Sequence, residues 1–255
     1  MEKGKTTILA VAGKGGVGKT SIAATMVRLL CQAHPDKKVL AIDADPAVGL
    51  ATALGVETTL TVDDIRKAVV AAAAGGSTEA AVELLGEARC RLFDAVEEER
   101  GFAFLAIGRP ESAGCYCKIN GYLKEVISLL AGNFDYVVID GEAGIEQINR
   151  RVMEKVTHLL LITDPSKKGI QVIGTIRDVA KELVMYESLG AIVNRLPGKE
   201  IIPMLHTGDI PVLSYIENDL SLADFDIRGE NVFFLPEESN IVKGVKQALE
   251  KLGLL

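Results

Sequence analysis

Eight residues near the start of the chain, GKGGVGKT at positions 13–20, have the types and spacing of a phosphate-binding loop. Glycines let backbone N–H groups turn toward phosphate oxygens, and the N-terminus of a following helix adds positive potential. Lys19 is placed to reach the β- and γ-phosphates of a nucleotide, and the Thr20 hydroxyl is placed to bind Mg²⁺. The motif requires a strand before it and a helix after it, and residues 7–12 and 21–33 have the patterns of those elements.

A second lysine, Lys14, lies inside the same loop. An ordinary phosphate-binding loop does not need it, and its side chain cannot easily fold back onto the nucleotide of its own chain. It could instead reach the phosphates held by a facing subunit, as an arginine finger does in trans. The loop therefore predicts ATP hydrolysis in a homodimer. The residues that we expect to bind ATP in this loop are Gly13, Lys14, Gly15, Gly16, Val17, Gly18, Lys19, Thr20 and Ser21.

Short apolar runs alternate with helix-length segments along the chain. Runs that are apolar on both sides are typical of parallel strands covered by helices on both faces. The pattern predicts a doubly wound α/β fold with a mostly parallel sheet of seven or eight strands. The predicted strands are 7–12, 38–43, 102–107, 136–140, 158–163, 189–193 and 210–215. The predicted helices include 21–33, 122–130 and 169–183, and segments within 56–100, EEER at 97–100 among them, are expected to be helices with a solvated face.

Length and charge limit the possible functions. The 255 residues, 48% of them hydrophobic, can bury one large core, so residues 1–255 are predicted to form a single domain. The net charge of −7 argues against a clustered basic face for nucleic acid. The longest apolar runs, 68–74 and 159–162, fall far short of the roughly 20 residues that cross a bilayer, and the N-terminal apolar segment is too short for a signal peptide. We expect a cytoplasmic protein that binds neither nucleic acid nor membrane.

Two of the four cysteines, Cys115 and Cys117, stand one residue apart. In a reducing compartment a close pair is typical of metal binding or redox chemistry. Side chains at i and i+2 of an extended loop point the same way, so two thiolates could bind one ion. Zinc and square-planar nickel take four ligands, so one chain is not enough. Cys31 and Cys90 lie in predicted helices, where a cysteine is more often a small buried hydrophobe.

A twofold dimer would complete the ligand set, because such an interface brings each residue opposite its own copy. Two C-x-C loops would then form a Cys₄ site for Ni²⁺ or Zn²⁺ on the axis. Four cysteines from two chains could equally hold a [4Fe–4S] cluster. This is the same dimer that Lys14 would need in order to reach the phosphates held by a facing chain.

The form KGGVGKT resembles the loop of the deviant Walker A ATPases, which dimerise face to face around two nucleotides. This group includes the nitrogenase iron protein, the Min and Par ATPases and metal-insertion ATPases, and it implies a P-loop NTPase fold of the SIMIBI type. By the same resemblance Asp45, in IDADPA, matches the aspartate that orients the attacking water. Asp140, in YVVIDGEAGIE, matches the Walker B aspartate, and Asp43 is expected to be an outer-shell partner of Mg²⁺ or a structural residue.

The resemblance also implies further nucleotide contacts. Gly144 would offer a backbone N–H to the γ-phosphate, and Asn194, in AIVNR, matches an asparagine that contacts adenine. Arg195 follows it in the same ATP-binding segment. Glu217 stands where relatives usually have a proline, so the adenine contacts of residues 216–219 are left open.

The segment GCYCKIN before a predicted helix resembles the CooC-type nickel-insertion ATPases, which mature carbon monoxide dehydrogenase or, in a close relative, acetyl-CoA synthase. The resemblance implies slow, dimer-dependent hydrolysis of MgATP, a nickel site shared by two chains, and a nickel-iron-sulfur client enzyme. Two alternatives stay open. One is an iron–sulfur-carrying ATPase or reductase. The other is a Min- or Par-like spatial organiser, which would need a basic DNA-binding face or a basic membrane tail, whereas the apolar stripe at 241–252 predicts packing on the core.

Overall fold

The computed structural model describes residues 5–45, 49–74, 87, 90–92, 94–99, 101–108, 117–141, 152 and 154–255. Of residues 72–74 and 117–120 it describes only the backbone. The strands are β1 (Thr7–Gly13), β2 (Val39–Asp43), β3 (Glu97–Glu99), β4 (Phe102–Ala106), β5 (Tyr136–Asp140), β6 (Lys155–Thr163), β7 (Met185–Leu196) and β8 (Val212–Glu217). The helices are α1 (Lys19–Ala33), α2 (Gly49–Leu54), α3 (Val62–Ala74), α5 (Cys117–Ala131), α7 (Lys167–Leu183), α8 (Leu220–Arg228) and α9 (Asn240–Lys251), with 3-10 turns η1 (Lys199–Met204) and η2 (Val232–Phe234).

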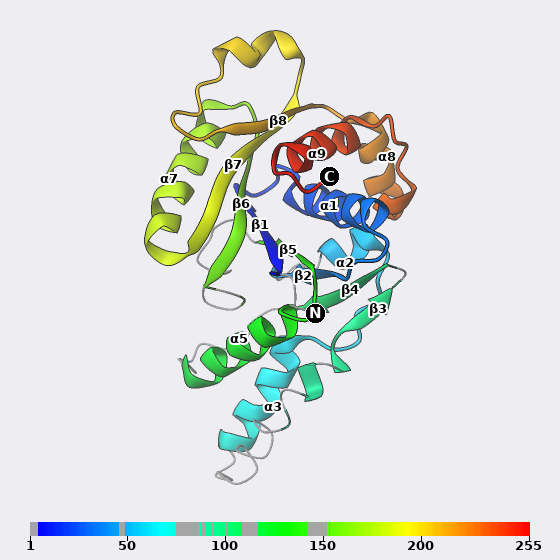
Figure 1. Ribbon diagram of the computed structural model, residues 1–255, viewed down its shortest axis with the longest axis vertical. Helices are drawn as coiled ribbons and strands as arrows, with labels where there is room; N and C mark the ends of the chain where they lie inside the picture. The colour runs from blue at the N-terminus through cyan, green and yellow to red at the C-terminus, as the bar shows by residue number, and fades with distance from the viewer. Residues whose placement is uncertain are drawn as a thin grey trace.

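The described strands form one sheet in the order β3-β4-β2-β5-β1-β6-β7-β8. All neighbouring pairs are parallel except β3 and β4, which are antiparallel. Helices α1, α2, α8 and α9 cover one face of the sheet, and α3, α5 and α7 cover the other (Figure 1). The predicted doubly wound α/β fold is confirmed, and all seven predicted strands are present. Their ends differ from the prediction by up to three residues, except for the strand predicted at 189–193, which extends over the twelve residues of β7.

The prediction of a helix at 97–100 was wrong. Glu97–Glu99 is an antiparallel edge strand, paired with β4 from Glu97 opposite Phe104 to Glu99 opposite Phe102. Glutamates favour helix, but pairing with the buried strand β4 overrides that preference here. Without β3, the backbone N–H and C=O groups on this edge of β4 would have no strand partner. A short edge strand of three glutamates also resists pairing with another molecule.

Two apolar layers hold the sheet between its helices. On one face, Ile22, Met26 and Leu30 of α1 repeat every four residues and are fully buried with the C-terminal helix α9. On the other face the core is built from α3, α5 and α7. Each fully buried large side chain contributes about 1.5–3 kcal/mol, so these layers fix where the strands end and therefore where polar side chains gather.

The apolar stripe of α9 packs on the core, as its spacing predicted. Ile241, Val242, Val245 and Leu249 are buried against α1 and β8. Within the described ranges, none of the helices combines the length and the apolar character needed to span a bilayer.

The contact of α9 with β8 yields a stability prediction. A Cβ added at Gly244 would lie 2.4 Å from Cγ1 of the buried Ile216, so Gly244→Ala should lower the free energy of unfolding by about 1–2 kcal/mol. Gly174→Ala in α7 is the matched control, because no atom of a described residue lies within 4 Å of its added Cβ, and it should raise stability by about 0.5–1 kcal/mol. Urea unfolding measures both. Equal effects of the two substitutions would contradict the packing described here.

Candidate functional site

Strand pairing gathers the polar residues at one edge of the sheet. Val11 pairs with Asp140 on β5, Gly13 pairs with Ile162 on β6, and Asp43 on β2 pairs with Asp140. Because these strands are parallel, all of these partners lie at their carboxyl ends. In open α/β sheets this edge is where ligands bind.

The loop from β1 to α1 depends on its glycines. Gly13 has φ +154°, and a Cβ there would lie 2.1 Å from the carbonyl oxygen of Ile162. Gly18 has φ +90°, and its Cβ would lie 2.6 Å from Nδ2 of Asn194. By contrast, no atom of another described residue lies within 4 Å of the Cβ positions of Gly15 and Gly16, so the described part of the chain leaves the mouth of the loop open. The loop therefore fits closely against the protein behind it and leaves room in front for phosphate groups.

The start of α1 supplies further groups for phosphate. Its N-cap is Gly18, and neither a side-chain cap nor an acidic first-turn residue occupies its N–H groups. The Lys19 side chain is almost entirely buried, and its ammonium donates to the Lys14 carbonyl oxygen at 3.3 Å across the loop. Gly18, Lys19 and Thr20 thus fit the phosphates of a nucleotide triphosphate with its Mg²⁺.

Two buried carboxylates lie behind the loop. Burial raises the pKa of Asp140 to about 7, against the opposing influence of the Thr20 hydroxyl and the Lys19 ammonium. Neither carboxylate oxygen of Asp140 has a well-formed hydrogen bond to any described residue. Burial also raises the pKa of Asp43 to about 6, although backbone N–H groups oppose the shift. Buried anions without partners are strained unless a cation joins them, which is what a nucleotide-bound Mg²⁺ would supply.

Asp43 and Asp45 have different surroundings. Asp43 accepts hydrogen bonds from the N–H groups of Asp45 at 3.1 Å and Leu50 at 2.9 Å, which fits the structural role considered for it. Asp45 is only partly buried at the end of β2. Its role in orienting water stays a prediction.

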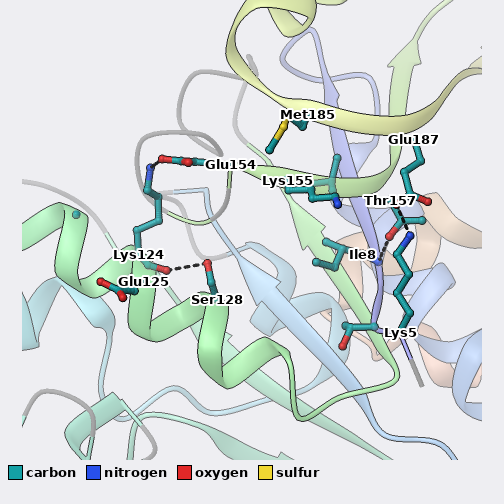
Figure 2. A pocket seen from close by; sticks show the side chains of 13 residues that line it. Lys5, Ile8, Lys124, Glu125, Ser128, Glu154, Lys155, Thr157, Met185 and Glu187 are labelled. Carbon is teal, nitrogen blue, oxygen red and sulfur yellow. Dashed lines mark hydrogen bonds and ion pairs between the residues drawn. The ribbon is translucent and has the colours of Figure 1, made fainter. Parts of the chain in front are cut away.

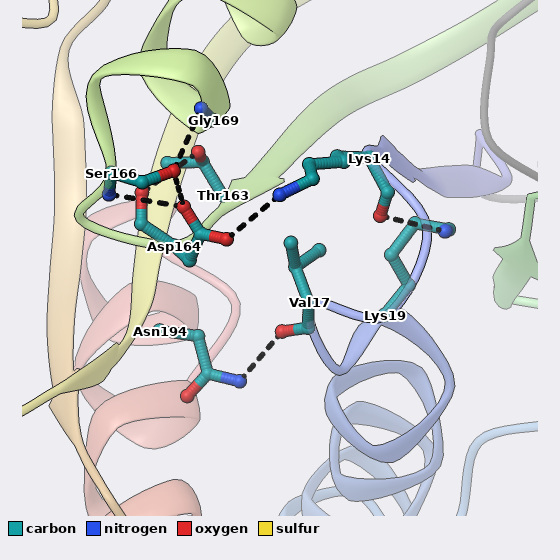
Figure 3. A network of polar contacts seen from close by, with 8 residues as sticks. All are labelled: Lys14, Val17, Lys19, Thr163, Asp164, Ser166, Gly169 and Asn194. Atoms are coloured by element: carbon teal, nitrogen blue, oxygen red, sulfur yellow. Dashed lines mark hydrogen bonds and ion pairs between the residues drawn. The ribbon is translucent and has the colours of Figure 1, made fainter.

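Asn194 lies at the back of the phosphate loop. Its Nδ2 donates to the Val17 carbonyl oxygen at 2.9 Å, and the side chain is buried (Figure 3). Arg195 is exposed, with φ +61°, and no other non-glycine residue in the described ranges has positive φ. The β7–β8 register breaks between Val193 and Leu196, so both residues leave the ladder here. Such strain is concentrated at binding sites. Contact of either side chain with adenine stays a prediction.

The Lys14 side chain has a partner that the sequence did not reveal. Its ammonium lies 3.2 Å from Oδ2 of Asp164, within the same chain (Figure 3). Asp164 follows Thr163, the last residue of β6, and β6 is the neighbour of β1. A carboxylate just beyond the strand at 158–163 was the available signal, but its relevance requires knowing that β6 pairs with β1.

Of the two proposed thiol ligands, only Cys117 lies among the described residues. Cys115 and Gly144 lie outside the described residues. Cys117 is the first residue of α5 and so is helical, not part of an extended loop as the sequence suggested. Among residues that the structure describes, no group of three or more His, Cys, Asp or Glu side chains could hold a metal ion.

The other two cysteines differ from each other. Cys31 is partly buried and donates to the Gly101 carbonyl oxygen at 3.2 Å, and burial raises the pKa of its thiol to about 11. Cys90 is exposed, so its interpretation as a buried hydrophobe was wrong.

A separate cavity of about 720 Å³ opens at the opposite, amino ends of β1, β6 and β7, beside α5 (Figure 2). Lys124 pairs with Glu154 at 2.6 Å, and Lys5 pairs with Glu187. The charges at its rim are therefore largely neutralised in pairs, and the cavity lies away from the phosphate loop.

The fold and the loop together define a P-loop ATPase. The chain matches the CobQ/CobB/MinD/ParA nucleotide binding domain over residues 8–232, and it belongs to that family. Members of this family hydrolyse ATP, and the nucleotide is bound with Mg²⁺.

Individual relatives extend this assignment. The chain is 32% identical to an uncharacterised ATP-binding protein of Methanocaldococcus jannaschii over 249 residues, which are 96% of this chain and 98% of the relative. It is 31% identical to the carbon monoxide dehydrogenase accessory protein CooC of Rhodospirillum rubrum over 187 residues, 69% of each chain. Its fold matches that of the septum site-determining protein MinD of Pyrococcus horikoshii, solved with Mg-ADP, with a TM-score of 0.72, 22% identity and coverage of 97% and 96%.

The raised pKa of Asp140 predicts a pH-dependent stability. The folded state keeps the proton on this carboxyl up to about pH 7, whereas the unfolded chain releases it near pH 3.8, so stability falls as pH rises between these values. Without nucleotide, Asp140→Asn should therefore stabilise the protein more at pH 8 than at pH 5, by on the order of 2 kcal/mol. Urea unfolding at both pH values measures this. Asp178→Asn, at an exposed position of α7, is the control. A gain for Asp140→Asn that is the same at both pH values would contradict the assignment.

Proposed function

We propose that the protein is a MgATP-hydrolysing homodimer that binds nickel through Cys115 and Cys117 of both chains and assists its insertion into a nickel-iron-sulfur enzyme, either carbon monoxide dehydrogenase or acetyl-CoA synthase. The observation that carries the ATPase part of this proposal is the phosphate loop, which fits closely against the protein behind it at the carboxyl edge of the sheet and has the buried carboxylate of Asp140 nearby.

The metal-handling part rests on the spacing of Cys115 and Cys117 and on the similarity to CooC. Gly121, one turn after Cys117 in α5, lines the cavity at the amino ends of β1, β6 and β7, so the start of α5 does not by itself bring the thiols to the edge of the sheet that carries the phosphate loop.

The comparison with CooC supports the choice of nickel. Zinc would fit the same thiolates, since both metals accept four such ligands. The coupling to nucleotide follows from the shared dimer, because ligands that favour one association state alter each other's affinity by a common factor.

The residues at the carboxyl edge divide the reaction between two chains. Lys19 and the N–H groups of the loop would hold the phosphates, and Thr20 would bind Mg²⁺, which screens the phosphate charge when bound. Asp45 would orient the attacking water, while Asp140 would lie behind the Mg²⁺ position. Lys14 of the facing chain would stabilise the charge that develops on the transferred phosphate.

A mixing experiment tests the action of Lys14 in trans. Lys14→Ala should abolish ATP turnover and keep ADP binding, and Asp45→Asn should keep ATP binding and lose turnover. In a mixed dimer, the site of the Lys14→Ala chain keeps Asp45 and receives Lys14 from the other chain. At protein concentrations high enough to force all chains into dimers, an equal mixture should therefore recover at most about a quarter of wild-type turnover, because random pairing makes half of the dimers mixed and one of their two sites is complete. A mixture as inactive as its components would show that Lys14 does not act in trans.

Metal titration tests the shared thiolate site. Nickel or zinc should bind at one ion per two chains and convert monomer to dimer, with affinity rising with pH as the thiols lose protons. Cys115→Ser with Cys117→Ser should remove both effects and leave ATP binding intact. Cys90→Ser, at an exposed cysteine, is the control. Mass and sedimentation are the readouts, and one ion per single chain in the wild type would rule out a shared site.

A spatial organiser is the second candidate, because MinD and ParA structures match this fold closely. The apolar face of α9 is occupied by the core, which argues against that helix as a membrane anchor. Co-sedimentation with anionic liposomes in the presence of ATP tests this alternative. Binding that survives loss of both cysteines would favour it over metal handling.

A further inference from the structure

Helix α2 follows Asp45 in the chain, lies beside α1 (Figure 1), and is too short to be stable by itself. It has six residues, whereas isolated helices shorter than about 12 residues are marginal in water. Its inner side chains, Leu50, Ala51 and Leu54, are buried in the apolar layer that also contains α1. Burial fixes this face, and hydrogen bonds at the two ends of α2 must fix its position along the core.

Asp43 holds the first end of α2. Its Oδ2 accepts from the N–H group of Leu50 at 2.9 Å, and its Oδ1 accepts from the N–H group of Asp45 at 3.1 Å. One buried carboxylate thus binds the backbone at both ends of the stretch from Asp45 to Leu50. A displacement of α2 would therefore reach Asp45 through this side chain.

Asn231 holds the other end of α2 from 177 residues further along the chain. Its Nδ2 donates to the Leu54 carbonyl oxygen at 2.6 Å, and its Oδ1 accepts from the N–H group of Phe233 at 2.8 Å, at the start of η2. Gly55 has φ +71°, and a Cβ there would lie 2.7 Å from the same Nδ2, so the chain leaves α2 tightly against Asn231. Both ends of the amide have partners, so its orientation is defined.

The segment that carries Asn231 is fixed to α1, the helix that begins at the phosphate loop. The buried guanidinium of Arg28 on α1 donates to the carbonyl oxygens of Val232 at 3.1 Å and Leu235 at 2.7 Å, and it pairs with Glu237. Asn231 therefore connects α2 to a segment that cannot move independently of α1.

We propose that Asn231 is a positioning residue for ATP hydrolysis, which ties the end of α2 to this segment and thereby sets the place of Asp45 relative to the phosphate loop. The inference rests on the proposed role of Asp45 in orienting water. A misplacement of about 1 Å can lower a rate by about 100-fold, because the reacting groups must be aligned. The contacts that Lys19 and the loop would make with phosphates do not pass through α2. Loss of the tether should therefore reduce turnover and leave nucleotide binding unchanged.

Asn231→Asp removes the tether with little change in shape. The new side chain keeps the oxygen that accepts from Phe233, but its carboxylate cannot donate to Leu54. Asn231→Ser is a second, neutral variant, since serine also suits the start of a helical turn but is too short to reach Leu54. We expect each variant to lower kcat for MgATP about 3- to 30-fold at protein concentrations that saturate dimer formation, with KM and ADP affinity within about twofold of wild type.

Asn133→Asp is the matched control. The Nδ2 atom of Asn133 donates to the carbonyl oxygens of Leu129 at 3.2 Å and Leu130 at 3.1 Å, at the end of α5. The substitution thus removes the same kind of hydrogen bond from a helix that is not joined to Asp45. It should lower the urea unfolding midpoint and leave kcat unchanged.

An unchanged kcat in the two Asn231 variants would overturn the proposal. A loss of ADP affinity as large as the fall in kcat would also overturn it, because that would show damage to the whole nucleotide site. So would an equal fall in kcat for Asn133→Asp. The variant Asp45→Asn separates the two ideas: if it keeps turnover, the role of Asp45 fails, and if it loses turnover while both Asn231 variants keep theirs, only the role of Asn231 fails.

Discussion

The close approach of β1 to β6 at Gly13 is the constraint on which the site depends. A side chain at this position would collide with the Ile162 carbonyl oxygen, so only glycine lets the chain leave β1 at the point where the phosphate loop must turn. The same parallel pairing continues to β5, which brings Asp140 beneath the loop. Loop, carboxylates and Lys14 are therefore consequences of one strand order.

This arrangement costs electrostatic energy in the isolated chain. Asp43 and Asp140 are buried next to each other at the ends of paired strands, and the charge of Asp43 raises the pKa of Asp140 beyond the effect of burial. The protein tolerates that cost because helices on both faces bury a large apolar surface around the sheet. A bound nucleotide with Mg²⁺ would relieve it. The site is thus assembled before its ligand binds, and the groups whose burial costs the most free energy are the ones that a bound nucleotide with Mg²⁺ would stabilise.

The sequence predicted the parts of this molecule that local patterns determine. The phosphate loop, the strands of the sheet and the buried stripe of α9 follow from spacing and apolar periodicity, which are properties of neighbouring residues. The edge strand Glu97–Glu99 could not be predicted in this way, because pairing with β4 overrode a composition that favours helix. The Lys14–Asp164 ion pair could not be predicted either, since 150 residues separate its members and only the pairing of β1 with β6 brings them together. The exposure of Cys90 likewise depends on the surroundings of its helix and not on its sequence.

Dimerisation around two nucleotides is the central claim, and native mass spectrometry tests it directly. The Asp45→Asn chain with MgATP should be found as a dimer that carries two nucleotides, and the same chain with ADP should be mostly monomeric with one. Lys14→Ala with MgATP should also be mostly monomeric, because the contact between chains is lost while the chain's own phosphate loop is intact. A Lys14→Ala chain that forms the two-nucleotide dimer as fully as Asp45→Asn, or an Asp45→Asn chain that binds ATP only as a monomer, would contradict the account.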